Sequence, residues 1–83
     1  MSNNKKDLEE IAEIISIAIA RENSSVRYYR EASSKAVTES VKKMFSILEK
    51  QEMEHETELR AQLHEIEAQI ELEKKKKRNN SRI

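Results

Sequence analysis

The chain of 83 residues is long enough for one small domain, and 39% of those residues are charged while only 4% are aromatic. It contains no cysteine, which excludes disulfides, thiolate-bound metals and iron–sulfur clusters, and its formal net charge of zero gives no support for nucleic-acid binding. No signal peptide and no apolar run of membrane-spanning length is visible, so we expect a cytoplasmic protein that binds neither membrane nor nucleic acid.

The absence of glycine and proline, together with many Glu, Lys, Ala, Ile and Leu residues, predicts an all-α fold. We expect one domain over residues 1–83, with a first helix at about 7–33, a turn at 34–38, a second helix at about 39–77 and a basic tail at 74–83. The two helices would form an antiparallel hairpin. Two helices alone bury little apolar surface, so a stable monomer is not expected.

The first helix has an apolar stripe interrupted by one charge. Residues along this stripe recur at alternating steps of three and four, as in the seam of a packed helix. The predicted stripe comprises Leu8, Ile11, Ile15, Ala18, Glu22, Ser25, Tyr29 and Ala32. A charged residue in the middle of a seam is costly unless it is paired or bound to a metal, which draws attention to Glu22.

The turn follows two serines and ends at a threonine. Ser33 and Ser34 compete for local backbone hydrogen bonds and therefore favour a turn. Thr38 is the best residue to cap the N-terminus of the second helix, because its hydroxyl can accept a hydrogen bond from a free backbone N–H.

The second helix repeats the pattern of an apolar stripe with polar residues in its middle. Its predicted stripe comprises Val41, Phe45, Leu48, Glu52, His55, Leu59, Gln62 and Ile66. Glu52 and His55 are three residues apart, so they are neighbours on one face of the helix. A carboxylate and an imidazole side by side can bind one transition-metal ion.

The heights of the polar residues match across the hairpin. With the turn centred near Ala36, Glu22 lies 14 residues before it and Glu52 lies 16 residues after it. At about 1.5 Å per residue, these two side chains lie within roughly one helical turn of the same height. An antiparallel hairpin is therefore predicted to bring Glu22 together with Glu52 and His55.

Two patterns resemble those of a known superfamily. In the first helix Glu22 precedes Tyr29 by seven residues, and in the second the stretch Phe45–His55 has the spacing F-x-x-L-x-x-x-E-x-x-H. Both resemble the half-patterns of the rubrerythrin and ferritin-like superfamily, over roughly residues 15–66. A full member carries the helix pair twice, whereas this chain carries it once and is similar to half-sized members such as the encapsulated ferritins.

The resemblance implies a shared metal site. Half-sized members build a ferritin-like four-helix bundle from two chains and place a di-iron centre between them. By this resemblance the hairpin dimerises, Glu22, Glu52 and His55 are the metal ligands and catalytic residues, and Tyr29 lies close by. Two chains would supply four carboxylates and two imidazoles, and two ferrous ions would balance the four negative charges.

The implied function is a ferroxidase, which binds and oxidises Fe(II) for iron storage or detoxification. Such a protein would be a homodimer or a larger ring of dimers. Iron storage would also require a shell, which would add an encapsulating shell protein as a partner and a nanocompartment as the location. The absence of cysteine excludes a rubredoxin domain. The alternatives are a metal-free helical dimerisation module, in which the polar residues set the pairing, and a di-metal site that holds manganese or zinc.

Simpler interpretations stay open for each residue. Glu52 and His55 could be a surface pair on a charged helix, and Glu22 could reach solvent from the seam. Tyr29 could hydrogen-bond a ligand carboxylate or only pack in the core. His64 lies nine residues after His55 and so faces the opposite side, where we expect solvent.

Three further features have two interpretations each. A second apolar face is either a wide core stripe or an oligomer contact; it comprises Ile14, Ile17, Ile19, Met44 and Ile47. Glu49 and Glu56 are either solvated partners of basic residues or part of an iron access path. The run Lys74–Arg78 is either a solvated helix end or a polyanion-binding segment.

Overall fold

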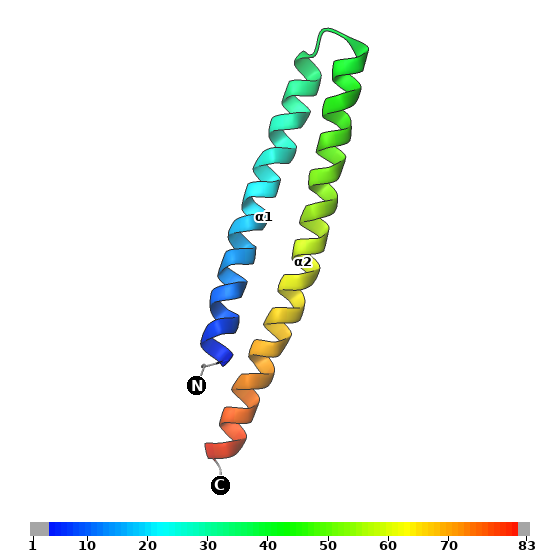
Figure 1. Ribbon diagram of the computed structural model, residues 1–83. Helices are drawn as coiled ribbons and strands as arrows, with labels where there is room; N and C mark the ends of the chain where they lie inside the picture. Colours follow the sequence, from blue (N-terminus) through cyan, green and yellow to red (C-terminus); the bar gives the residue numbers. More distant parts are fainter. Residues whose placement is uncertain (1–3, 82–83) are drawn as a thin grey trace.

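A computed structural model of the chain describes residues 4–81, with side chains over 4–76. Its two helices, α1 (Asn4–Lys35) and α2 (Glu39–Ser81), lie side by side and run in opposite directions (Figure 1). The part of the chain that the structure describes contains no strand. The predicted all-α hairpin is confirmed.

The turn is shorter than predicted, because α1 continues two residues into it, whereas α2 begins at Glu39 as predicted. Only residues 36–38 separate the helices, and the Ala36 N–H donates to the Ser33 carbonyl over 3.2 Å. The Thr38 hydroxyl accepts a hydrogen bond of 3.3 Å from the Val41 N–H. Thr38 is therefore the N-cap of α2, as predicted.

Both helices also run further than predicted at their outer ends. α1 begins three residues earlier, and α2 continues to Ser81, so the basic segment is helical as far as it is described. Lys74 pairs with Glu71 and Lys76 pairs with Glu73, each over 3.6 Å. In each pair the two residues are three positions apart and so share a face of the helix. Without glycine or proline to stop it, a helix with such pairs continues. The last two residues of the predicted tail lie outside the described residues.

The contact between the helices follows alternating steps of four and three. Ile19 and Val26 on α1 are each 7% exposed and are the two buried residues of the described chain. Around them lie mainly half-buried side chains: Leu8, Ala12, Ile15, Glu22 and Tyr29 on α1, and Phe45, Glu49, Glu52, Glu56, Leu59, Leu63, Ile66 and Ile70 on α2.

The predicted stripes were partly wrong. On α1 the prediction included Ile11, which is exposed, and assigned Ile19 to a second face although it is buried between the helices. On α2 it included His55 and Gln62, which are exposed. The run of apolar residues around Ile15 and Ile19 allows two phases, and one residue rotates the phase by about 100°. Packing against α2 selects the phase that the sequence does not specify.

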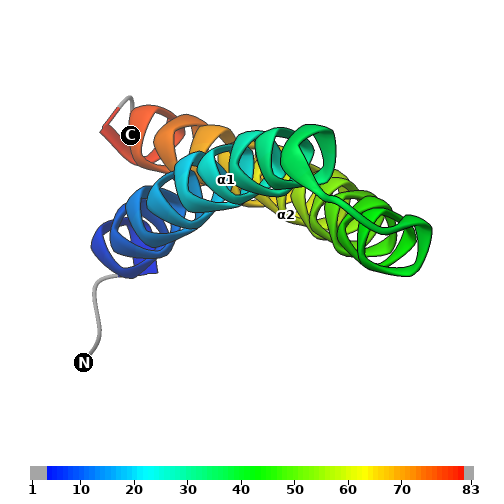
Figure 2. The same ribbon diagram turned by 90° about the horizontal axis from the view of Figure 1, so that it is seen from above.

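The hairpin is a rod with an incomplete core. Its extents are 69 × 17 × 16 Å and its radius of gyration is 19.2 Å, compared with about 12 Å for a compact domain of this length. Seen from above, the two helices cross (Figure 2). The accessible surface is 6852 Å², against roughly 5,100 Å² for a folded monomer of this mass. No helix within the described residues has a segment long and apolar enough to cross a membrane.

Candidate metal centre

Three side chains from the two helices meet near the middle of the rod. Glu22 of α1 and Glu52 and His55 of α2 each offer one ligand atom, and these atoms all lie within 4.8 Å of one another. Glu22 Oε2 is 3.7 Å from His55 Nδ1. The heights predicted from the residue count are therefore confirmed, whereas the role of these residues as metal ligands stays a prediction.

The two sides of this cluster differ in exposure. Glu22 lies in the seam between the helices, and its side chain is 24% exposed. His55 lies one helical turn beyond Glu52 at the edge of the seam, and its side chain is 57% exposed. The cluster thus has a sheltered carboxylate side between the helices and an imidazole side that is open to the surroundings.

The cluster brings two carboxyl groups close together. The nearby Glu52 carboxyl, which can share a proton with Glu22, raises the pKa of Glu22 above its usual range. Partial burial and the charges of Glu52 and Glu56 raise this pKa further, and His55 opposes them. Glu22 Oε2 has no hydrogen-bond partner although it is inaccessible to solvent.

A metal ion fits this arrangement. A buried carboxylate oxygen without a donor is costly, and a bound cation removes that cost as well as the repulsion between Glu22 and Glu52. Two carboxylates and an imidazole form a donor set that suits iron, manganese and zinc. The residues present therefore fit a divalent transition metal.

A cavity of about 560 Å³ opens beside the cluster. Its walls come from both helices: Ala18, Glu22, His55, Glu58, Leu59 and Gln62. Ala18 lies one turn before Glu22, and its small side chain leaves space that a larger residue would fill. The cavity connects the open, imidazole side of the cluster with the surface of the hairpin.

Exposed apolar residues continue from this cavity along both helices. Ile11 lies seven residues before Ala18 and so shares its face of α1. Met44 lies eleven residues before His55, which is close to three full turns, and Val41 lies one turn further back. We call this side of the hairpin, with the cavity in its middle, the cavity face.

The opposite side is polar. The equivalent positions there are occupied by Ser16, Asn23, Arg30, Ser46 and Arg60. Within the described side chains, Met53 is the large apolar residue exposed on that side. The hairpin therefore has one face that resembles an interface and one that resembles a solvated surface.

Tyr29 lies in an aromatic group closer to the turn. Its ring stacks on Phe45 with centroids 6.2 Å apart and meets the edge of Tyr28 at 5.6 Å. Within the described residues its hydroxyl makes no hydrogen bond. The packing interpretation of Tyr29 therefore has direct structural support, and its role beside the ligand carboxylates stays a prediction.

The glutamates proposed for an iron access path have arginine partners. Arg30 donates to Glu49 over 2.6 Å across the helices, and Arg60 donates to Glu56 over 3.0 Å along α2. The sequence also places Glu58 beside the site but does not assign it to the access path, and it is Glu58 that lines the cavity. Glu58 lies three residues after His55, so the two share one face of the helix. With the correct phase of α2, the sequence would have placed Glu58 beside the cavity.

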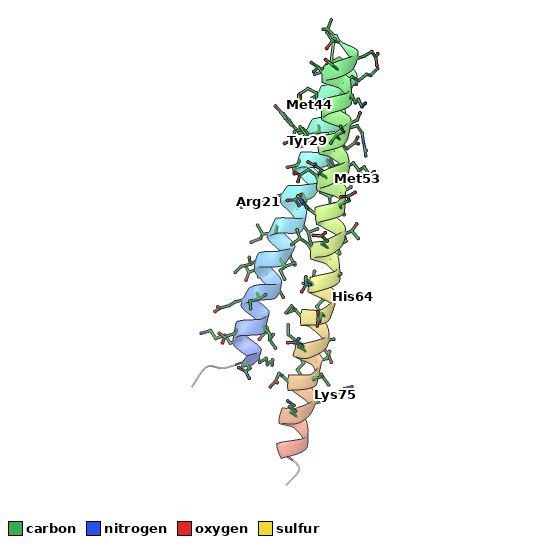
Figure 3. All side chains as sticks on the ribbon, turned by 45° about the vertical axis from the view of Figure 1, so that its right-hand side comes forward. Arg21, Tyr29, Met44, Met53, His64 and Lys75 are labelled. Carbon is green, nitrogen blue, oxygen red and sulfur yellow. The ribbon has the colours of Figure 1, made fainter. Side chains whose placement is uncertain are left out.

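His64 occupies the solvent position predicted for it. Its side chain is 91% exposed and lies 3.8 Å from Glu67 on the same helix (Figure 3). It is therefore not a member of the metal cluster.

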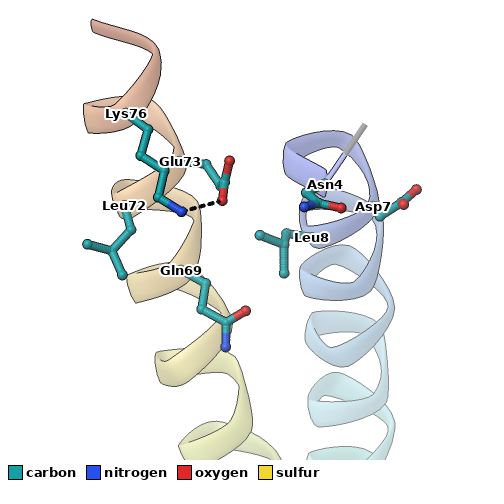
Figure 4. A pocket seen from close by; sticks show the side chains of 7 residues that line it. All are labelled: Asn4, Asp7, Leu8, Gln69, Leu72, Glu73 and Lys76. Atoms are coloured by element: carbon teal, nitrogen blue, oxygen red, sulfur yellow. Dashed lines mark ion pairs between the residues drawn. The ribbon is translucent and has the colours of Figure 1, made fainter. Parts of the chain in front are cut away.

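A second hollow, of about 390 Å³, lies between the outer ends of the helices (Figure 4). Its lining mixes charge, amide and apolar groups: Asn4, Asp7, Leu8, Gln69, Leu72, Glu73 and Lys76. The ammonium group of Lys76 pairs with Glu73 over 3.6 Å, so this hollow offers no comparable set of metal donors.

Comparison with known proteins gives one match. Residues 13–82 match the family model described as Rubrerythrin, which spans both helices and the whole cluster. No curated protein and no solved structure matches the chain significantly.

Proposed function

Because the chain belongs to the Rubrerythrin family, we propose that two copies of this hairpin assemble a di-iron centre that binds and oxidises Fe(II). The family includes redox-active di-iron proteins. The observation that carries the proposal is the meeting of Glu22, Glu52 and His55 from two helices within 4.8 Å. Such an activity would serve iron storage or detoxification.

One chain supplies half of the expected ligand set. It offers two carboxylates and one imidazole, whereas di-iron helical bundles use four carboxylates and two imidazoles. The missing half would come from the side on which His55 is exposed and the cavity is open. With four carboxylates and two ferrous ions, the completed site would be neutral, as a partly buried site requires.

The surface of the hairpin supports a second copy as the partner. The chain exposes roughly 1,700 Å² more surface than a compact monomer of its mass, which is about twice the roughly 800 Å² that each partner buries in a standard interface. Three exposed apolar residues, Ile11, Val41 and Met44, flank the cavity. A second copy on the cavity face would cover Ile11, Val41 and Met44 and complete the metal site in one step.

The side chains have separate tasks in this proposal. Glu22 and Glu52 approach each other across the helices, so their carboxylates would hold the metal from both helices. His55 would bind one ion from the edge of the seam. When bound, the ferrous ions supply the electrons that reduce dioxygen or peroxide, and the protein holds the ligands at fixed distances.

The test combines stoichiometry with mass. Anaerobic titration with Co(II), a spectroscopic substitute for Fe(II), should saturate at one ion per chain. Sedimentation of dilute protein should show dimers favoured by the metal and reversed by a chelator, because a ligand that binds only the dimer stabilises it. Addition of Fe(II) in air should then give a saturable rise in ultraviolet absorbance. The proposal fails if Co(II) does not saturate or if the mass distribution is the same with and without metal.

A further inference from the structure

One carboxylate at the cavity has no task in the site described above. Glu58 lines the cavity together with Glu22 and His55. It lies one helical turn after His55 on α2, so the two side chains are neighbours on that helix. Within the described residues the Glu58 carboxylate has no hydrogen bond and no ion pair.

Other carboxylates close to the cluster differ from Glu58 in this respect. Glu49 is bound by Arg30 and Glu56 is bound by Arg60, and both guanidinium groups neutralise the charge that would attract a cation. Glu54 is exposed but does not line the cavity. Glu58 is therefore the carboxylate that combines a free charge with a direct position on the cavity wall.

We propose that, in the metal-free hairpin before a second copy covers the cavity face, Glu58 receives a hydrated divalent cation at the mouth of the cavity and passes it to Glu22 and His55. This inference rests on the proposed function, since it assumes that the cluster is the destination of the metal. A free carboxylate in a concave site raises the local cation concentration and the association rate. Glu58 is outside the three residues whose ligand atoms lie within 4.8 Å of one another, so it would hold the cation only in passing.

The geometry gives the cation a short route. From Glu58 the next donor toward the seam is His55, one turn back on α2, and beyond it lies Glu22. The route passes Ala18, whose side chain is too small to block it. Gln62, one turn further along α2, offers a neutral oxygen at the outer end of the cavity.

The test measures the rate of metal association rather than activity. An anaerobic stopped-flow experiment measures the rate at which each protein takes Co(II) in competition with a fluorescent chelator. The proteins compared are the wild type, Glu58→Gln and Glu65→Gln. Glu65 is the matched control, because it lies seven residues after Glu58 on the same face of α2, is exposed and does not line the cavity. Glu58→Asp, which keeps the charge, serves as the conservative variant.

We expect Glu58→Gln to slow association about fivefold to tenfold at low ionic strength and to leave the Co(II) affinity and spectrum unchanged. High salt should reduce the difference to less than about twofold, because it screens an exposed charge. Glu65→Gln should associate at the wild-type rate, and Glu58→Asp should recover most of that rate.

Three outcomes would overturn the inference. The first is an association rate in Glu58→Gln that equals that of the wild type, and the second is an equal loss of rate in Glu65→Gln. The third is a changed Co(II) affinity and spectrum in Glu58→Gln, which would make Glu58 a permanent ligand. In each case wild-type protein still saturates with Co(II), so the proposed function stands. Wild-type protein that does not bind Co(II) contradicts the proposed function itself.

Discussion

The Oε2 atom of Glu22 on α1 lies 3.7 Å from the Nδ1 atom of His55 on α2. This contact joins residues that are 33 positions apart in the sequence. It connects the buried carboxylate of the seam with the imidazole that borders the open cavity. A substitution on either helix should therefore affect the same site. Its effect on stability should depend on whether the replaced side chain is exposed or lies in the seam.

Replacing the exposed imidazole should remove metal binding without unfolding the hairpin. We expect His55→Ala to weaken Co(II) binding roughly a hundredfold or more, at least as much as the loss of an outer hydrogen-bond partner costs a metal site. Helix content should be retained, because His55 is exposed and alanine favours helix. Isothermal titration and circular dichroism measure the two effects.

The control for this variant is His64→Ala, since His64 lies on the same helix but is 91% exposed and outside the cluster. It should bind Co(II) like the wild type. A large loss of affinity in His64→Ala, or full affinity in His55→Ala, would contradict the assignment of the site.

Neutralising Glu22 should stabilise the metal-free protein at neutral pH. The pKa of Glu22 is raised from its ordinary value of 4.5 by Glu52 and by partial burial, so ionisation of Glu22 opposes folding. This opposition is absent below the ordinary pKa and becomes complete as the pH rises above the raised pKa. Glu22→Gln should therefore unfold at higher temperature than wild type near neutral pH, with the difference vanishing below about pH 4.5.

Thermal unfolding with a chelator present, repeated from acidic to neutral pH, measures this effect. Glu54→Gln is the control, since Glu54 is an exposed carboxylate of the same stretch and should show no comparable pH dependence. With metal added the order should reverse, because Glu22→Gln loses a ligand. A Glu22→Gln variant less stable than wild type at neutral pH without metal would disprove the electrostatic account.

A charge on the cavity face should separate the two copies. Met44 and Met53 are 48% and 50% exposed and nine residues apart, so they lie on opposite sides of α2 (Figure 3). Met44→Glu should weaken the dimer by about 2 kcal/mol, or roughly thirtyfold, as expected for a charge in the centre of an interface. Sedimentation equilibrium over a concentration series gives both dissociation constants.

Met53→Glu provides the matched control, because it adds the same charge at the same exposure on the polar side. Its dimer should match that of the wild type. Equal weakening by both substitutions would mean that the cavity face is not the interface.

Removing the Tyr29 hydroxyl separates its two possible roles. Tyr29→Phe keeps the ring that stacks on Phe45, so the melting temperature should be unchanged. Because this hydroxyl makes no hydrogen bond within the described residues, Co(II) affinity should also stay unchanged, which would assign Tyr29 to packing alone. A loss of about tenfold, as for an outer hydrogen bond, would instead place the hydroxyl beside a ligand carboxylate.

The sequence predicted the height of the site better than the packing around it. With no glycine or proline to interrupt either helix, counting residues from the turn was enough to bring Glu22 to His55. The phase of the seam could not be predicted, because apolar residues occupy nearly every position around Ile15 and Ile19.

The charged residues of the seam were unpredictable for another reason. Glu49 and Glu56 are half-buried between the helices. Patterns in the sequence predict apolar residues at such positions. They are tolerated there because Arg30 and Arg60 reach them from the polar side of the hairpin. The place of Glu58 on a cavity wall was not predicted, because a cavity depends on a missing side chain, here at Ala18, as much as on the residues that line it.

The short turn between α1 and α2 sets the order in which the hairpin can close. Contacts near the turn join close neighbours in sequence, such as Ser33 and Lys42 at 9 positions and Arg30 and Glu49 at 19. Each doubling of the loop costs about 0.6 kcal/mol more entropy, so pairing should begin at the turn and proceed outward. The contact between Glu22 and His55 then forms after the Arg30–Glu49 pair, and the helix ends come together last. Amide hydrogens at those ends should exchange with solvent before those beside the turn.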